Sequence, residues 1–377
     1  MRAKSKNYYI GFCFPDGAEK EYACAVPGDL KMKYIASKFG GNLTVVSLAP
    51  KKRAGRGRRF SSSIGTMKTL FSFGTKNALA RKLNEFVRKV YLFFLFRFKI
   101  RPCDNALIYH STYTMFISRL CPIRRRHVIL EVEEIYGHDA LADKPYLKKE
   151  LAAIKRFAKF ITVNDYIAPS LGIPEENCVV SYGVVNPDYQ KKKRQFDRNH
   201  IHVLYAGTIS ERKSGAFAAA RCAEFLPKRY RMHIAGFGSE GAVKELREII
   251  DDSNRHDGRC RIEFHGMLTG DALDSLLDSC DVGISTYVMR PDFANHSCPS
   301  KLMTYVTHGL KVVSGYSDAL GMAEIARNWS FFRTYDPKEI AAAIERAASV
   351  EASDYKTVLR EVDDQLVGFL RRERFLV

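Results

Sequence analysis

The segment best suited to chemistry lies between Asn295 and Ser314 and begins Asn-His-Ser-Cys-Pro-Ser-Lys. Pro299 suits the first turn of a helix, where its missing N–H would have no intrahelical partner in any case. Ser300 and Lys301 then bring unpaired backbone N–H groups, the positive end of a helix dipole and an ammonium group to one point. This combination predicts a diphosphate-binding site. The alternative is an ordinary helix start with an incidental lysine.

A second basic loop, Gly207–Gly215, follows a predicted strand that ends at Ala206. Its glycines flank Arg212 and Lys213, and a strand-to-helix turn of this kind can hold such a cation over a phosphate. The spacing differs from that of a P-loop. A plain turn with solvated charges is the alternative.

The elements that would position these loops alternate between short β-branched segments and helical ones, which predicts parallel sheets covered on both faces. We predict two doubly wound (Rossmann-like) α/β domains at 1–190 and 191–352, with a polar linker at 189–199. A charged C-terminal helix within 353–377 can cross back to the first domain. Ligands of such sheets bind beyond the carboxyl ends of the strands. The expected site is therefore a cleft between the two domains.

The predicted strands of the first domain are Tyr8–Phe14, Leu43–Leu48, Ala106–Tyr109, His127–Val132, Phe160–Val163 and Cys178–Val180. Those of the second are His202–Ala206, Arg231–Ala235, Ile262–His265, Val282–Ser285 and Lys311–Ser314.

Positive charge is concentrated in the first half of the chain. The net charge is +18, and residues 1–200 hold 37 Lys and Arg against 17 Asp and Glu. The stretch 51–126 contains 19 basic residues and only two acidic ones. Such asymmetry predicts a polyanionic partner for this region, either a membrane surface, a nucleic acid or an anionic substrate.

The basic stretch has two parts. Residues 51–59 have no hydrophobic period and predict a mobile basic loop. From Leu79 onward, apolar and aromatic residues recur at helical spacing, with four cations between them: Arg81, Lys82, Arg88 and Lys89. A basic amphipathic helix rich in aromatics suits an anionic bilayer surface, whereas the alternative is a core helix with a solvated basic face. No nucleic acid is expected, because no RNA- or DNA-binding motif is present.

Other classes of protein are excluded by composition. The longest apolar run, Val90–Phe96, is too short to span a bilayer as a helix. The nine cysteines form no Cys-x-x-Cys pair, which argues against a zinc cage or a disulfide framework and favours a reduced, cytosolic protein.

Taken together, these loops resemble those of nucleotide-sugar-dependent glycosyltransferases of the GT-B fold, specifically glycosyltransferase family 4. The resemblance covers roughly 105–348 and rests on the order of several short motifs. They are Ser181–Val185, Gly207 with Lys213 and Gly215, Ala235–Gly238, Phe264–Gly266, Pro299–Leu302, Gly309 and Val312–Val313. The chain departs from the family at Thr208, where an arginine is frequent, and at Thr304, where a glutamate commonly contacts the donor ribose.

The resemblance implies a role for each loop. Arg212, Lys213, Ser300 and Lys301 would bind the donor diphosphate, and the base and ribose would lie near four further residues, Gly238, Met267, Leu268 and Thr304. Transfer would proceed with retention of configuration and without a cofactor or a metal, the nucleotide sugar being a co-substrate. In the first domain, Glu133, Glu134 and His138 are candidate catalytic residues that would contact the sugar or the acceptor hydroxyl. Purely structural ion pairs are the alternative for them. The loop with Asp16 and Gly17 is a further donor-facing candidate.

The expected function is transfer of a sugar to a glycan or lipid-linked acceptor in cell-surface polysaccharide synthesis. The enzyme would be cytoplasmic and peripheral on the inner face of the membrane. Two alternatives remain: a nucleotide-sugar epimerase or hydrolase of the same fold, and a non-catalytic basic module that binds anionic lipid or RNA. Thr208 and Thr304 favour the second alternative.

Overall fold

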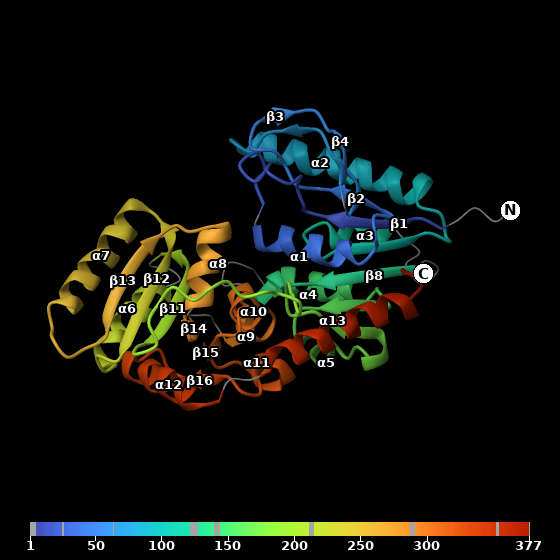
Figure 1. The fold of residues 1–377 in the computed structure, drawn as a ribbon. Coiled ribbons are helices and arrows are strands. Elements are labelled where there is room, and N and C mark those ends of the chain that lie inside the picture. The colour runs from blue at the N-terminus through green and yellow to red at the C-terminus, as the bar shows by residue number, and fades with distance from the viewer. Residues whose placement is uncertain are drawn as a thin grey trace. The chain divides into compact units, whose positions relative to one another are not determined.

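The computed structural model describes residues 5–24, 26–62, 64–120, 127–138, 144–210, 215–286, 291–351 and 354–376. The chain forms two compact units: the first comprises Met1–Val184 and Val362–Val377, and the second comprises Val185–Glu361. In Figure 1 the C-terminal segment of the first unit is red, and the elements with which it shares a core are blue and green.

The units divide between Val184 and Val185 rather than at the predicted residue 190. The predicted linker is bonded to the second unit. The Tyr189 hydroxyl donates to Asp278 Oδ2 at 2.8 Å, and Arg194 forms an ion pair with Asp281 at 2.7 Å. These partners hold the segment against the second unit instead of leaving it as a solvated connection.

An eight-stranded sheet forms the centre of the first unit, in the order β10-β9-β8-β7-β1-β2-β5-β4 (Figure 1). Neighbouring strands are parallel except β4 and β5, which are antiparallel. Its strands are β1 (Asn7–Gly11), β2 (Leu43–Ser47), β4 (Arg59–Ser62), β5 (Gly65–Thr69), β7 (Asn105–Tyr109), β8 (His127–Val132), β9 (Lys159–Thr162) and β10 (Cys178–Val180). The strand order reverses between β1 and β7, and in doubly wound sheets ligands bind at this switch point.

The segment expected to be a mobile basic loop is part of this sheet system instead. Residues 59–62 form β4, and a small antiparallel pair joins β3 (Ala54–Gly55) to β6 (Ser72–Phe73). The backbone of Arg58 is bonded on both sides to Thr69, with N–O distances of 3.0 and 2.9 Å. These strands are short and rich in Gly, Arg and Ser, so they carry no alternating hydrophobic pattern from which to predict them.

The helices of the first unit cover both faces of its sheet (Figure 1). They are α1 (Val26–Ser37), α2 (Ala78–Phe94) with a π-helical turn η1 (Leu95–Lys99), α3 (Thr114–Leu120), η3 (Tyr136–His138), α4 (Lys144–Ile154), α5 (Ile167–Leu171), η4 (Glu175–Asn177) and, from Val362 onward, α13 (Tyr355–Arg372). Asn77 caps the start of helix α2, where its side chain accepts a hydrogen bond from the backbone N of Ala80 at 2.8 Å.

The C-terminal helix completes the core of the first unit. Leu366, Phe369 and Leu370 are buried at helical spacing and pack in one cluster with Met32 of α1 and Tyr9 of β1. This cluster explains why the last residues of the chain belong to the first unit.

The second unit is built on six parallel strands in the order β13-β12-β11-β14-β15-β16. They are β11 (Ile201–Ile209), β12 (Tyr230–Gly238), β13 (Arg261–Gly266), β14 (Val282–Ser285), β15 (Lys311–Gly315) and β16 (Ser330–Phe332). This is the Rossmann strand order 3-2-1-4-5-6, and the reversal lies between β11 and β14. The sequence did not predict β16, which has only three residues.

The second sheet is enclosed by helices α6 (Gly215–Cys222), α7 (Glu240–Asn254), α8 (Gly270–Ser279), α9 (Pro291–Asn295), α10 (Ser300–Thr307), α11 (Asp318–Met322) and α12 (Pro337–Ser349), with short 3₁₀ turns η5 (Ala223–Phe225) and η6 (Glu324–Ala326). On one face, Val203 and Ile234 pack with Ala219 of α6, Leu246 of α7 and Ile344 of α12. The prediction of two doubly wound α/β domains is confirmed by the strand orders of both sheets.

Gly283 of β14 is expected to tolerate no side chain. A Cβ there would lie 2.4 Å from Cγ of the buried Tyr305 ring. We expect Gly283→Ala to lower the free energy of unfolding by about 1–3 kcal/mol, the usual cost of overpacking a core. Urea unfolding measures it. Gly241→Ala on α7 is the control, because no atom lies within 4 Å of its Cβ position. Equal stability of the two variants would contradict this packing.

Candidate functional site

At the switch point of the second unit, Tyr305 of α10 links the helix to both strands by hydrogen bonds. Its hydroxyl accepts a hydrogen bond from Ala206 N of β11 at 3.0 Å and donates one to Ile284 O of β14 at 3.2 Å. The tyrosine is fully buried. It therefore fixes helix α10 relative to the two strands between which a doubly wound sheet binds its ligand.

Lys301, in the first turn of α10, lies at the carboxyl end of β11. Its Nζ is 4.0 Å from the centroid of the Tyr205 ring, and a Cβ on Gly207 would lie 2.8 Å from the same Nζ. The Tyr205 hydroxyl donates to Thr208 O at 3.0 Å, which orients the ring beneath the ammonium group. The structure thus brings Lys301 and the exposed Ser300 to the strand end where the sequence predicts diphosphate binding.

The other predicted donor-binding residues also follow strand ends or lie on α10. Gly238 is the last residue of β12, Met267 and Leu268 follow β13, and Thr304 is exposed one turn after Ser300. Met267 is 65% exposed. Arg212 and Lys213 lie outside the residues that the structure describes.

The glycine-containing segment Ala235–Gly238 is part of strand β12, which continues past the predicted strand end at Ala235. Gly236 pairs with Gly207 of β11, and a Cβ on Gly236 would lie 1.9 Å from Gly207 O. The glycines therefore allow two strands to approach closely, and this approach extends both strands past their predicted ends.

In the first unit, the predicted catalytic residues follow strand β8. Glu133 forms an ion pair with Lys31 of α1, and the same ammonium donates to the backbone O of Ser181. Glu134 lies in the loop after β8, and His138 ends η3. Glu133 therefore has a structural partner, and the catalytic roles of all three stay predictions.

Glu131 is the most strongly perturbed carboxyl group of this region, and the sequence did not single it out. It is fully buried and accepts a hydrogen bond from the Tyr9 hydroxyl. Burial and the nearby charge of Glu133 raise its pKa to about 8. The sequence signal that could have revealed its burial was its place in a predicted strand, where Glu131 lies on the same face as Ile129.

The loop that contains Asp16 and Gly17, predicted to face the donor, is partly anchored. Asp16 Oδ1 lies 2.7 Å from Lys33 Nζ, which also pairs with the buried Asp29 at 2.8 Å. Gly17 adopts φ 75°, a left-handed conformation that favours glycine. The loop is exposed, and its approach to a donor stays a prediction.

Helix α2 exposes its apolar face. The exposed side chains are Leu79 (68%), Leu83 (37%), Phe86 (65%), Val90 (39%), Phe93 (43%) and Phe94 (54%). Phe98, in η1, is 64% exposed. The inward-facing residues include Asn84 and Arg88, which are buried. This orientation is the reverse of a core helix with a solvated basic face, because the hydrophobic stripe is on the outside.

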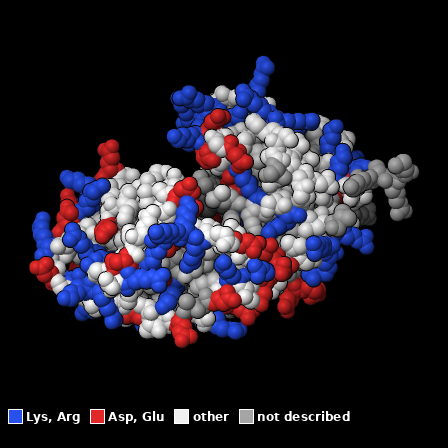
Figure 2. Space-filling model, in the orientation of Figure 1, with Lys and Arg blue, Asp and Glu red and all other residues white. Residues whose placement is uncertain are grey.

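Arg88 was predicted to face a membrane, and this prediction is wrong. It is 1% exposed, and its guanidinium donates to the backbone O of Leu48 at 2.6 Å and of Asn84 at 2.9 Å. Arg81 and Lys82 are exposed, and Lys89 is partly exposed beside Glu85. Figure 2 shows Lys and Arg side chains gathered over the β3, β4 and α2 region of the first unit.

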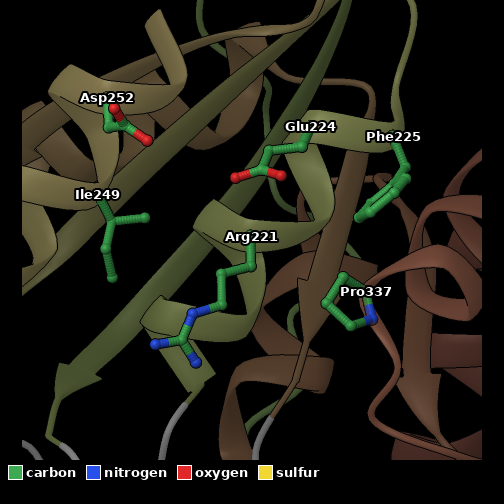
Figure 3. A pocket seen from close by; sticks show the side chains of 6 residues that line it. All are labelled: Arg221, Glu224, Phe225, Ile249, Asp252 and Pro337. Atoms are coloured by element: carbon green, nitrogen blue, oxygen red, sulfur yellow. The ribbon is translucent and has the colours of Figure 1, made fainter.

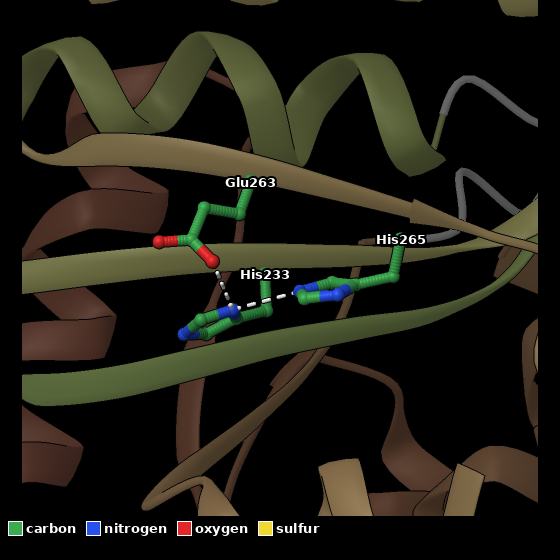
Figure 4. A group of neighbouring side chains, drawn as sticks. All are labelled: His233, Glu263 and His265. Carbon is green, nitrogen blue, oxygen red and sulfur yellow. Dashed lines mark hydrogen bonds and ion pairs between the residues drawn. The ribbon is translucent and has the colours of Figure 1, made fainter. Parts of the chain in front are cut away.

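Three side chains of the second unit have the spacing of metal ligands (Figure 4). His233 Nδ1 of β12 is 2.9 Å from His265 Nε2 and 3.7 Å from Glu263 Oε2, both of β13. His233 Nε2 in turn bonds to His202 Nδ1 at 2.9 Å. Burial and the neighbouring histidines lower the pKa of His233 to about 3, so the rings are neutral and satisfy one another. A cation would have to replace the proton between His233 and His265.

A surface pocket of about 310 Å³ lies among the helices of the second unit (Figure 3). Its lining residues come from α6, η5, α7 and α12: Arg221, Glu224, Phe225, Ile249, Asp252 and Pro337. All belong to helices rather than to strand ends, so this pocket is separate from the predicted site. Among the described residues, no helix is both long enough and apolar enough to cross a membrane.

No protein-family model matches the sequence, and no curated protein matches it. Solved structures do match over nearly the whole chain. An α,α-trehalose-phosphate synthase (UDP-forming) from Burkholderia xenovorans, in complex with glucose-6-phosphate, has a TM-score of 0.65 at 11% identity and covers 98% of both chains. Anabaena HepE, in complex with UDP, has a TM-score of 0.63 at 15% identity and covers 97% of this chain and 98% of its own. These similarities show a shared two-domain fold of the GT-B type.

Proposed function

We propose that this protein is a glycosyltransferase that moves a sugar from a nucleoside-diphosphate-sugar to a glycan or lipid-linked acceptor. The observation that carries the proposal is the position of Lys301 at the β11/β14 switch point. The hydrogen bonds of the buried Tyr305 fix helix α10 there, and the Lys301 ammonium lies over the Tyr205 ring. The resemblance to family 4, with its implied retention of configuration, and the GT-B fold support the same reading. HepE, which shares the fold, was solved in complex with UDP.

In the proposed reaction, the bond between the sugar C1 and the diphosphate oxygen breaks, and C1 forms a bond to the acceptor oxygen. The acceptor proton leaves with the diphosphate. Negative charge grows on the leaving diphosphate as the bond breaks. The Lys301 ammonium and the N–H groups at the start of α10 would stabilise that charge.

We further propose that the enzyme is cytoplasmic and binds an anionic membrane through helix α2. The exposed apolar stripe would enter the headgroup region, while Arg81, Lys82 and Lys89 would contact anionic lipid. A soluble monomer rarely exposes so contiguous an apolar surface without a partner. Attachment of this kind would bring the enzyme to a lipid-linked acceptor.

The reaction is tested by incubating the protein with UDP-, GDP-, ADP- and dTDP-sugars and separating the nucleotides released. We expect release of one nucleoside diphosphate that depends on added acceptor, such as a membrane extract containing lipid-linked glycans. Release that needs no acceptor would favour a hydrolase, and a changed sugar without release would favour an epimerase. Absence of turnover with every donor would contradict the transferase.

The membrane proposal is tested by sedimentation with phosphatidylglycerol vesicles. We expect Phe86→Ser with Phe94→Ser to reduce the bound fraction several-fold, since each exposed aromatic contributes buried apolar area. Neutralising Arg81, Lys82 and Lys89 should add a further loss of binding that is largest at low salt and shrinks as the salt concentration rises. The control is Lys244→Gln, an exposed lysine of α7. Unchanged binding in both α2 variants would contradict attachment through this helix.

Vesicle binding without nucleotide turnover would favour a non-catalytic lipid-binding module.

A further inference from the structure

A pocket of about 460 Å³ lies at the switch point of the first unit, at the carboxyl ends of β1, β2 and β7. Phe12, Leu48 and Thr112 follow these three strands and line it on one side. Helix α2 lines it on the other side, with the exposed Arg81 and the buried Arg88. The pocket thus occupies the position in the first sheet that Lys301 occupies in the second.

Arg88 brings a buried positive charge to this pocket. Its Nε and Nη1 donate to two backbone carbonyl groups, whereas its buried Nη2 has no hydrogen-bond partner. Among the described residues, Arg88 forms no ion pair, and burial lowers its pKa. A guanidinium group stays charged in proteins, so a buried one without a counter-ion calls for an anion.

Further donors face the same space. Arg81 lies two turns before Arg88 on α2, is exposed, and makes no ion pair with a described residue. The Tyr113 side chain lines the pocket, and its hydroxyl forms no hydrogen bond within the described part of the chain. The Phe12 ring lies 6.0 Å from the Tyr113 ring and closes an apolar side. Two cations, a hydroxyl group and an aromatic wall are together suited to a charged group on a larger organic molecule.

We propose that this pocket binds an anionic group, a phosphate or a carboxylate, carried by the acceptor. Arg88 would donate through Nη2, and Arg81 would contact the anion from the solvent side. The assignment to the acceptor rests on the proposed function, whereas binding of the anion does not. A phosphorylated acceptor could be a soluble sugar phosphate or the phosphate of a lipid carrier, and both present the same chemistry to the two arginines.

The test is calorimetric titration of the full chain carrying Lys301→Met, so that the second unit's proposed diphosphate site does not contribute. Glucose 1-phosphate should bind, and glucose should not, at constant ionic strength. Arg81→Gln should weaken the binding of glucose 1-phosphate about tenfold, as expected for loss of a charge-assisted contact. Arg88→Met should weaken it at least as much. Lys148→Gln, which removes an exposed lysine of α4, is the control and should bind normally.

A second arm replaces the soluble ligand with farnesyl phosphate in phosphatidylcholine vesicles. Binding of glucose 1-phosphate alone assigns the pocket to sugar phosphates, and binding of farnesyl phosphate alone assigns it to a lipid carrier. The proposal is overturned if Arg81→Gln binds both ligands as tightly as Lys148→Gln. Arg81 is exposed, so this result can be read even where Arg88→Met does not fold. Anion binding without any nucleotide turnover would leave the pocket intact and remove only its assignment to an acceptor.

Discussion

Replacing Lys301 with methionine is expected to lower kcat for glycosyl transfer by about 10²–10³-fold, equivalent to about 2.7–4 kcal/mol of transition-state stabilisation. Methionine keeps an unbranched side chain but removes the ammonium group, which lies over the Tyr205 ring. The lost charge matters most as the diphosphate leaves, because negative charge increases at that step. Steady-state rates with the preferred donor measure the effect.

The matched control is Lys244→Met, which removes an exposed ammonium from α7 in the same unit. It should leave kcat unchanged. A Lys301→Met enzyme within twofold of wild type would show that the ammonium at the β11 end does not act on the reacting diphosphate. A change confined to KM would indicate that Lys301 binds donor and transition state equally.

Glu131→Gln is expected to change how stability depends on pH. In the folded protein the pKa of Glu131 is raised to about 8, above the ordinary value of 4.5 that applies to the unfolded chain. The folded state therefore keeps this proton while the unfolded state loses it. The resulting stabilisation is fully present below about pH 4.5 and is lost as pH rises toward 8. Between pH 5.5 and 8.5, the free energy of unfolding of the wild type should fall by on the order of 3 kcal/mol because of this group. The glutamine variant has no proton to lose at this position and should not show this decrease.

Urea unfolding of both proteins at several pH values measures this difference. Glu85→Gln, at an exposed glutamate of α2, is the control and should follow the wild-type pH profile. Parallel profiles for wild type and Glu131→Gln would show that Glu131 is ionised in the folded protein. A glutamine variant that is more stable at pH 8.5 and similar at pH 5.5 would establish a buried neutral acid beside Tyr9.

The sequence predicted the fold well, because the alternation of strands and helices is a strong local signal. Strands β8, β10 and β14 begin and end at the predicted residues. The strands between residues 54 and 73 were missed, since their pairing depends on backbone contacts rather than on a hydrophobic period. The length of β11 was also underestimated. Its last residues pair with the glycine-rich end of β12, a contact that no local pattern reveals.

The candidate site was predictable where a single segment carries the chemistry. Ser300 and Lys301 stand at a helix start, which spacing alone reveals. Arg88 and Glu131 could not be placed in this way, because their burial is decided by distant partners, the Leu48 carbonyl and the Tyr9 hydroxyl. Helix α2 shows the same difficulty. The helical spacing of its residues predicts an apolar face and a polar face. Which of them points inward is decided by the hydrogen bonds of Asn84 with the backbone of Phe73 and Gly74.

The most direct test of the central claim is a thermal-shift panel with UDP, GDP, ADP, CMP and dTDP at millimolar concentration. Ligand that binds only the folded state raises the melting temperature by mass action. We predict that one nucleoside diphosphate raises Tm in the wild type and in Lys244→Met but not in Lys301→Met. Equal shifts in all three proteins would place nucleotide binding away from α10. No shift with any nucleotide would contradict a donor site in the second unit.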